Sequence, residues 1–216
     1  NAAVKSRIAE LAGPLEEIRT KVVASSGGVI EGDRAVCRVQ ECSMGNLVAD
    51  AMLARVADQG VTIAIANSGG IRSSIDEGDV TMGEVLAVLP FQNTLSTFQI
   101  SGQGVIDALE NGVSQVEEVK GRFPQVAGIT FTWDASIAPN EGRIVEVMVG
   151  GAAIDPAATY SVVTNNYVRN GGDGYKMFRS AANAYDYGPD LADVVAEYLA
   201  DAQGYQPYTD GRIAQK

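Results

Sequence analysis

Histidine is absent from this chain of 216 residues, and cysteine is limited to two positions. The absence of histidine excludes the serine and cysteine hydrolases that use a histidine base, and it excludes most zinc sites. Such a chain either performs its chemistry with carboxylates or performs no reaction by itself. We favour the second interpretation, which makes the chain a binding domain.

Long apolar stretches and positive charges are also scarce. No stretch approaches the roughly 18 to 20 apolar residues of a membrane-spanning helix, so we expect no transmembrane segment. Asp and Glu number 27 against 16 Lys and Arg, which gives a formal charge of −11. Because such a surface repels phosphate backbones, we expect no nucleic acid among the partners. An anionic small molecule would have to be held by a few concentrated arginines.

The two cysteines, Cys37 and Cys42, lie five positions apart. Structural zinc needs about four nitrogen or sulfur ligands, so this pair predicts no metal site in the chain. A local disulfide is the interpretation we favour, and it would imply an oxidising compartment. The alternative is a pair of small buried apolar residues.

The first part of the chain has a helical pattern. Apolar residues at spacings of three and four predict an amphipathic helix over residues 3–23, interrupted by Gly13-Pro14. Such a helix either connects to an upstream part or packs on its own domain. The chain begins with Asn1 instead of methionine, so we expect a trimmed or processed segment. The stripe consists of Ile8, Leu11, Leu15, Ile18 and Val22.

After residue 28 the pattern alternates between strands and helices. We expect strands over residues 35–40, 61–66, 94–100, 129–133, 144–149 and 160–164. We expect helices over residues 45–56, 81–88, 105–113 and 190–199, the second opened by a capping box of Thr81 and Glu84. Gly150-Gly151 predicts a turn between the last two strands. The sum is a single mixed α/β domain with helices packed on both sides of β-sheet layers.

Two glycine-rich segments follow predicted strands. Residues 67–72 (Asn-Ser-Gly-Gly-Ile-Arg) come directly after the apolar strand, where the backbone can approach a ligand and Arg72 can supply a forked cation. Residues 170–175 (Asn-Gly-Gly-Asp-Gly-Tyr) place Asp173 where it can accept two hydrogen bonds from a diol. Either segment could instead be a simple tight turn. Neither matches a phosphate loop or a dinucleotide fingerprint.

Arginines and aromatic residues add to this picture. Arg34 and Arg38 are four apart, so a strand would place both on one face, and with Arg72 they could form a pocket of three arginines. Phe91 and Tyr167 lie at loop edges, where aromatic rings can stack on a planar ligand. The alternatives are solvated arginines and aromatic residues packed in the core.

Taken in order, these segments resemble the C-terminal domain of the 5′-nucleotidase family. The segment from Glu41 to Ala51 matches the pattern E-x-x-x-G-N-L-x-x-D-A, and residues 67–72 follow it. Residues 78–81, 89–93 and 170–175 complete the series. The resemblance extends over most of the chain, from about residue 29 to residue 213.

The resemblance implies an enzyme of two domains. In this family an N-terminal metallophosphoesterase domain holds two divalent metal ions, such as zinc or manganese, and performs the hydrolysis, while the C-terminal domain binds the nucleoside. A helical connector permits a large domain rotation. We therefore expect residues 1–28 to be the connector and residues 29–216 the substrate-binding domain. The catalytic domain of the same polypeptide would be the partner of this chain, which would be inactive alone.

The resemblance also assigns roles to individual residues. Phe91 and Tyr167 would sandwich the base, with tyrosine at position 167 where well-known members carry phenylalanine. Asp173 would accept hydrogen bonds from the ribose hydroxyls, and Asn67 and Asn93 would contact the ribose or the base.

Further residues follow from the same resemblance. Arg38 and Arg72 would bind ribose and phosphate oxygens, with Arg34 joining them as in bacterial members. Gly70 and Gly121 would belong to the same substrate-binding pocket. The two cysteines match a pair that some animal members form as a disulfide, which strengthens the case for oxidation.

The expected function is substrate binding within a 5′-nucleotidase-like phosphohydrolase in the periplasm, outside the cell or at its surface. Related two-domain hydrolases act on UDP-sugars, cyclic nucleotides, NAD or a sulfur carrier, and these remain alternatives. A further alternative is a stand-alone nucleoside-binding module. Two stacking rings favour a ligand that contains a base over a sulfur carrier.

Overall fold

The computed structural model describes residues 4, 5, 7, 13 and 16–216. Its centre is a five-stranded sheet of strand order β10-β4-β9-β2-β5. Strands β2 and β9 run parallel, while the other neighbouring pairs are antiparallel. The carboxyl ends of β2 and β9 therefore lie at the same edge of the sheet. The bounds are β2 (Ile63–Asn67), β4 (Leu95–Ser101), β5 (Pro124–Ala127), β9 (Thr159–Asn165) and β10 (Ala182–Tyr185).

The central strand β2 separates two hydrophobic cores. Its large side chains, Ile63 and Ile65, belong to one core, whereas Ala64 and Ala66 belong to the other. The alternation follows from the pleat of a strand, and the small alanines leave room for a helix to pack closely. Every residue of β2 is buried, as its continuous apolar sequence predicts.

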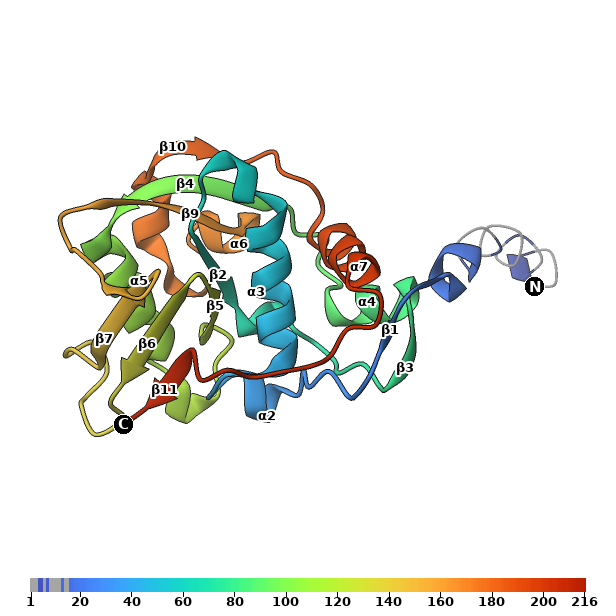
Figure 1. The fold of residues 1–216 in the computed structure, drawn as a ribbon, viewed down its shortest axis with the longest axis horizontal. Helices are drawn as coiled ribbons and strands as arrows, with labels where there is room; N and C mark the ends of the chain where they lie inside the picture. The colour runs from blue at the N-terminus through green and yellow to red at the C-terminus, as the bar shows by residue number, and fades with distance from the viewer. Residues whose placement is uncertain (1–3, 6, 8–12, 14–15) are drawn as a thin grey trace.

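Helices cover one face of this sheet, and a helix with a second sheet covers the other (Figure 1). The first face carries α3 (Ser43–Arg55), α4 (Met82–Val88) and α7 (Leu191–Asp201). The opposite face carries α5 (Gly102–Val113) and a sheet of order β11-β6-β7-β8. The strands of this sheet are β6 (Ile129–Trp133), β7 (Ile144–Val149), β8 (Ala152–Ala153) and β11 (Ile213–Gln215).

A small third sheet pairs β1 (Val22–Ser26) with β3 (Gly78–Thr81). Residues 16–20 are helical and exposed, and they project beyond this pair (Figure 1). Ile18 is 53% exposed, so this part of the predicted apolar stripe does not pack on the domain. Ile8, Leu11 and Leu15 lie outside the described residues. Val22 belongs to a strand, so its assignment to the helix was wrong.

Short helical segments complete the fold. None of those in the described residues, nor any longer helix there, is both long and apolar enough to cross a membrane. They are α2 (Arg34–Cys37), α6 (Asn166–Arg169), η1 (Ala57–Gln59), η2 (Ser68–Gly70), η3 (Val116–Glu118), η4 (Gly172–Gly174) and η5 (Lys176–Ser180).

Most predicted elements are confirmed to within a few residues, including the capping box at Thr81 and Glu84. The strand predicted over residues 35–40 is wrong, because α2 occupies this position. The Asp33 side chain accepts a hydrogen bond from the Ala35 backbone and starts a helical turn there. The Gly150-Gly151 turn joins β7 to the short β8 and does not lead directly to β9. Strands β1, β3, β5, β8, β10 and β11 were not predicted.

Candidate functional site

A cavity of about 530 Å³ opens beside the carboxyl end of β2. Ligands of α/β sheets commonly bind at this end of the strands. The cavity is lined by Arg38, Asn67, Gly69, Gly70, Arg72, Phe91, Asn93, Gly121, Tyr167 and Asp173.

The structure brings nine of the ten site residues named from the sequence to this cavity. The exception is Arg34, which lies exposed on α2, one helical turn before Arg38. Gly69 lines the cavity although it was not named among the site residues. The lining residues come from segments far apart in sequence, so the sheet edge is what assembles them.

The carboxylate of Asp173 is held from behind by two donors. The Asn67 side-chain amide donates to one carboxylate oxygen at 2.7 Å, and the Tyr167 hydroxyl donates to the other at 3.0 Å. Asp173 itself has a positive φ of 52°, and its backbone carbonyl accepts a hydrogen bond from the Asn111 side chain at 3.2 Å. These contacts fix the carboxylate, and it retains lone pairs for hydroxyl donors of a ligand.

Two glycines allow the walls of the cavity to approach each other. The Gly69 backbone N–H donates to the Gly121 carbonyl at 2.7 Å. A Cβ atom on Gly121 would lie 2.7 Å from the Cα of Gly69, a distance too short for any side chain. Glycine at position 121 is therefore required by packing as well as by its place in the cavity.

Two arginines, Arg38 and Arg72, line the cavity, and Arg34 lies close enough for its charge to act on Arg38. Burial lowers the pKa of the Arg38 guanidinium, and the charges of Arg34 and Arg72 lower it further, while Asp173 opposes the shift. One terminal nitrogen of Arg38 donates to the Val119 carbonyl at 3.2 Å. Its Nε is buried and has no hydrogen-bond partner within the described part of the chain. An anion would relieve the mutual repulsion of these cations.

The two aromatic side chains of the cavity are unusually open to solvent. Phe91 is 55% exposed and Tyr167 is 47% exposed, in contrast to the fully buried Phe98 and Tyr175. The Arg72 guanidinium lies 5.6 Å from the centroid of the Phe91 ring, a cation–π contact. Burial, followed by the charge of Asp173, raises the pKa of the Tyr167 hydroxyl, which therefore stays a neutral donor.

The predicted disulfide between Cys37 and Cys42 is present, with 5.2 Å between the two Cα atoms. The buried side chain of Gln125 supports the loop that the disulfide closes. Its amide nitrogen donates to the carbonyls of Cys37 and Gln40, both at 2.8 Å, and its oxygen accepts from the Cys42 backbone at 3.3 Å. Since Arg38 directly follows α2, these contacts also fix the segment that carries it.

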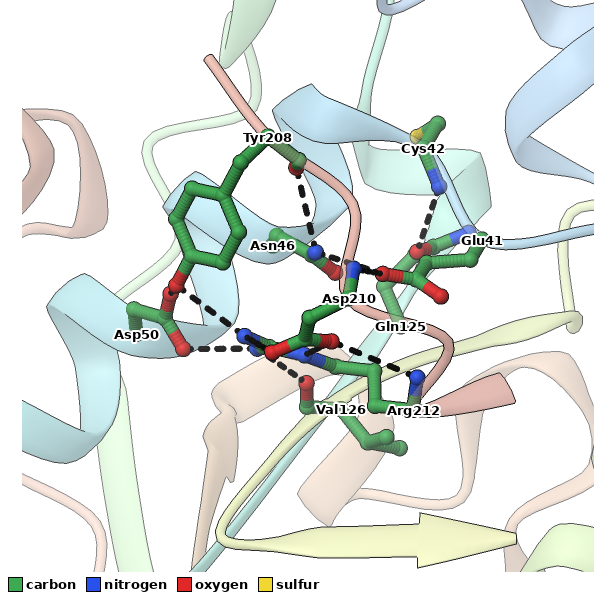
Figure 2. A network of polar contacts seen from close by, with 9 residues as sticks. All are labelled: Glu41, Cys42, Asn46, Asp50, Gln125, Val126, Tyr208, Asp210 and Arg212. Atoms are coloured by element: carbon green, nitrogen blue, oxygen red, sulfur yellow. Dashed lines mark hydrogen bonds and ion pairs between the residues drawn. The ribbon is translucent and has the colours of Figure 1, made fainter. Parts of the chain in front are cut away.

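A second polar cluster surrounds Arg212 near the C-terminus (Figure 2). The guanidinium forms two hydrogen bonds to Asp210, at 2.8 and 2.9 Å, and one to Asp50 at 2.7 Å. Two more reach the Val126 carbonyl and the Tyr208 hydroxyl, both at 3.0 Å. These five contacts match the five N–H donors of an arginine, so none remains for a ligand.

The Arg212 cluster includes the residues that carry the family resemblance most clearly. The Asn46 amide donates to Glu41 at 2.7 Å and to the Tyr208 carbonyl at 3.2 Å, and the Asp210 backbone donates to Glu41 at 2.8 Å (Figure 2). The segment from residue 41 to residue 51 thus anchors the C-terminal segment. None of its residues lines the cavity beside β2.

The sequence analysis missed several residues that support the cavity from behind. Asn165 is 2% exposed and donates to the side-chain oxygen of Asn67 at 2.9 Å. Arg122 donates to the Asn111 side chain at 3.3 Å. Asn165 lies between the end of a strand and a glycine-rich turn, and this position could have indicated that it supports the site. No local sequence pattern indicates such a role for Asn111 or Arg122.

In the part of the chain that the structure describes, no group of three or more His, Cys, Asp or Glu side chains is arranged to hold a metal ion. The site has the charges and rings of a binding pocket. Aromatic rings, a carboxylate and arginines can interact with a flat ring, with hydroxyl donors and with an anion, respectively.

Comparison with known proteins gives a consistent result. The trifunctional nucleotide phosphoesterase YfkN of Bacillus subtilis is 38% identical over the whole chain, which spans 15% of that protein. A rat 5′-nucleotidase is 33% identical over 99% of the chain, which spans 40% of the relative. The crystal structure of a 5′-nucleotidase precursor from Thermus thermophilus matches 98% of the chain with a TM-score of 0.92 and 38% identity, and the chain covers 42% of it.

The chain thus spans less than half the length of each of these relatives. Their names all refer to phosphoester or nucleotide hydrolysis, and the shared fold covers nearly every residue of this chain. The family model described as the C-terminal domain of 5′-nucleotidases matches residues 19–180, and the chain belongs to this family.

Proposed function

We propose that the cavity beside β2 binds the nucleoside part of a nucleotide, and that the chain is the substrate-binding domain of a metal-dependent phosphohydrolase. One observation carries the proposal: a single cavity is lined by two exposed rings, a fixed carboxylate and two arginines. A nucleoside monophosphate offers the complementary groups, which are a flat π face, a cis-diol and a dianion.

The base would stack between Phe91 and Tyr167. Both rings line the cavity and both are about half exposed, so a ligand would bury apolar surface there that the free chain leaves in water. Asn93 also lines the cavity and would supply a polar contact to the base or the ribose.

The ribose hydroxyls would donate to Asp173, whose carboxylate is already oriented by Asn67 and Tyr167. Arg38 and Arg72 would bind ribose and phosphate oxygens. Arg34 would contribute only through its charge or through a side-chain movement, because it is not a lining residue of the cavity. Gly70 and Gly121 would let the ligand approach the backbone.

The hydrolysis itself would take place on a metallophosphoesterase domain N-terminal to this chain. Two divalent metal ions, such as zinc or manganese, would be held there. Residues 1–28 would connect the two domains and permit their rotation, which agrees with the exposure of residues 16–20. The disulfide favours a periplasmic, secreted or cell-surface protein.

Calorimetric titration with adenosine and AMP tests the proposal. The chain should bind both weakly, and Phe91→Ala should weaken binding by about 1–3 kcal/mol through the loss of stacking. Tyr187→Ala is the matched control, because Tyr187 is 85% exposed and lies outside the cavity. No phosphate should be released from AMP when Mn²⁺ or Zn²⁺ is added to the isolated chain.

Three results would contradict this assignment. Absence of nucleoside binding would remove the nucleoside-binding role. Equal effects of the Phe91 and Tyr187 substitutions would place the base elsewhere, and turnover by the isolated chain would locate catalysis within it. Parallel titrations with a UDP-sugar, a cyclic nucleotide and NAD identify the preferred substrate class.

A further inference from the structure

A buried side chain, that of Asn165, is connected to the cavity through the side chain of Asn67. Asn165 is the last residue of β9 and the N-cap of α6, and it is 2% exposed. Its side-chain oxygen accepts from the Val168 backbone at 2.9 Å, and its nitrogen donates to the Asn67 oxygen at 2.9 Å. Because the helix cap uses the oxygen, only one orientation of the amide satisfies both contacts.

The orientation of the Asn165 amide determines which atom of the Asn67 side chain faces Asn165. Asn67 is 4% exposed, and its oxygen is occupied by the donor from Asn165. Its nitrogen is therefore directed at the carboxylate of Asp173, 2.7 Å away. The chain of contacts runs from a helix cap, through two buried amides, to the carboxylate that lines the cavity.

We propose that Asn165 is a positioning residue that holds the Asp173 carboxylate in the orientation that accepts hydrogen bonds from a ligand, and so makes the site selective for ligands with vicinal hydroxyl groups. The inference rests on the proposed nucleoside-binding function. Without the donor of Asn165, the present orientation of the Asn67 amide is held only by its hydrogen bond to Asp173. If it rotates, its oxygen faces the Asp173 carboxylate, and two acceptors then repel each other.

The substitution Asn165→Asp separates the two tasks of this residue. Aspartate remains a good N-cap for α6 but replaces the donor to Asn67 with an acceptor. The affinity for adenosine should fall about tenfold or more, because the loss concerns a hydrogen bond to a charged group. The affinity for 2′,3′-dideoxyadenosine, which lacks both hydroxyls, should stay unchanged.

The substitution Asn170→Asp is the matched control. Asn170 is exposed, caps the other end of α6, and donates its side-chain nitrogen to the Asn166 carbonyl at 2.8 Å. The substitution Asn170→Asp adds one negative charge near the cavity, as Asn165→Asp does, but at a side chain that does not contact Asn67. Both ligands should bind this variant as they bind the unsubstituted chain. Asn165→Ser retains a cap and removes the donor without adding charge, and it should show the same selective loss to a smaller extent.

A measurement without ligand keeps this inference separate from the proposed function. The side-chain NH₂ resonances of Asn67, assigned through Asn67→Ser, should shift strongly in Asn165→Asp and stay in place in Asn170→Asp. Unchanged resonances overturn the inference even if nucleosides bind. Equal losses for adenosine and its dideoxy analogue overturn it as well, since they indicate a general structural role. If the unsubstituted chain binds no nucleoside, the proposed function fails and with it the claim of selectivity, while the resonances still report on the orientation of Asn67.

Discussion

The two polar clusters of this domain are built from similar groups but differ in what they leave unpaired. Arg212 has a hydrogen-bond acceptor for each of its five N–H donors, all of them within the chain. Arg38, beside the cavity, has a buried Nε without a partner in the described residues, and its pKa is lowered by burial and by neighbouring arginines. The first cluster is closed and the second is open to a ligand.

The electrostatics of the two clusters differ in the same way. Burial lowers the pKa of Arg212, but the hydrogen bonds that its guanidinium donates to Asp210 and Asp50 outweigh burial and raise the pKa overall. In turn, the hydrogen bond from Arg212 lowers the pKa of Asp210. Each charge in this cluster stabilises its partner, whereas the cations beside the cavity repel one another. Closed networks of this kind hold a fold together, and open ones bind ligands.

Removal of the central charge of the closed cluster should give the largest effect. In Arg212→Met the mostly buried carboxylate of Asp50 loses its partner, whose side chain is itself only 9% exposed. The free energy of unfolding should fall by about 3–5 kcal/mol, as for other buried pairs that lose one member. Denaturant titration measures the loss. The affinity for adenosine, measured on the folded fraction, should not change.

The control for this substitution is Arg55→Met. Arg55 pairs with Glu197 at 3.6 Å, and both side chains are about half exposed, so the loss should stay below about 1 kcal/mol. If Arg212→Met weakened ligand binding as much as it weakened stability, the division into a closed and an open cluster would be wrong.

Neutralisation of the acceptor in the open cluster should show the reverse pattern. Asp173→Asn keeps the size of the side chain but turns an amide nitrogen toward one of the two donors that now face it. The affinity for adenosine should fall by about 1.5–3 kcal/mol, the range for hydrogen bonds to charged groups. Because Asp173 is partly exposed, the unfolding free energy should change by less than about 1 kcal/mol.

Calorimetry and denaturant titration of the same Asp173→Asn sample decide between the two effects. A loss of stability without a loss of affinity would show that the Asp173 turn serves the fold and not the ligand.

The same contrast explains which parts of the structure could be predicted from the sequence. The glycine-rich turns lie next to their own strands, so local patterns placed the segments that carry Asn67, Arg72 and Asp173 directly after predicted strands, and the family resemblance joined them in one site. The partners of the segment from residue 41 to residue 51 lie more than 150 positions away, at Tyr208, Asp210 and Arg212. No local pattern indicates such contacts, so the sequence identified this segment as a family motif without revealing its structural role.

The wrong assignment of residues 35–40 has a different cause. We expected a strand there, but Asp33 caps a helical turn. The Cys37–Cys42 disulfide closes the loop that follows, and Gln125 donates a hydrogen bond to that loop. Arg38, the C-cap residue of α2, lines the cavity, whereas Arg34 lies exposed at the start of the same helix. The expectation that the two arginines share one face of a strand was therefore wrong.

The smallest expected effect concerns the closed cluster and the decrease of the unfolding free energy at alkaline pH. Burial, together with the hydrogen bond to Asp50, raises the pKa of Tyr208 to about 12. A phenol with a raised pKa stays protonated in the folded state while the unfolded chain begins to ionise near pH 10. Its contribution to stability is therefore complete below about pH 10 and is lost as the pH rises to about 12.

Tyr208→Phe should flatten this decline, measured as the unfolding free energy between pH 9 and pH 12, whereas Tyr187→Phe, at an exposed site, should leave it as it is. If the unfolding free energy fell equally with pH in Tyr208→Phe and in the unsubstituted chain, the hydroxyl of Tyr208 would not contribute to the hydrogen bonding of the Arg212 cluster.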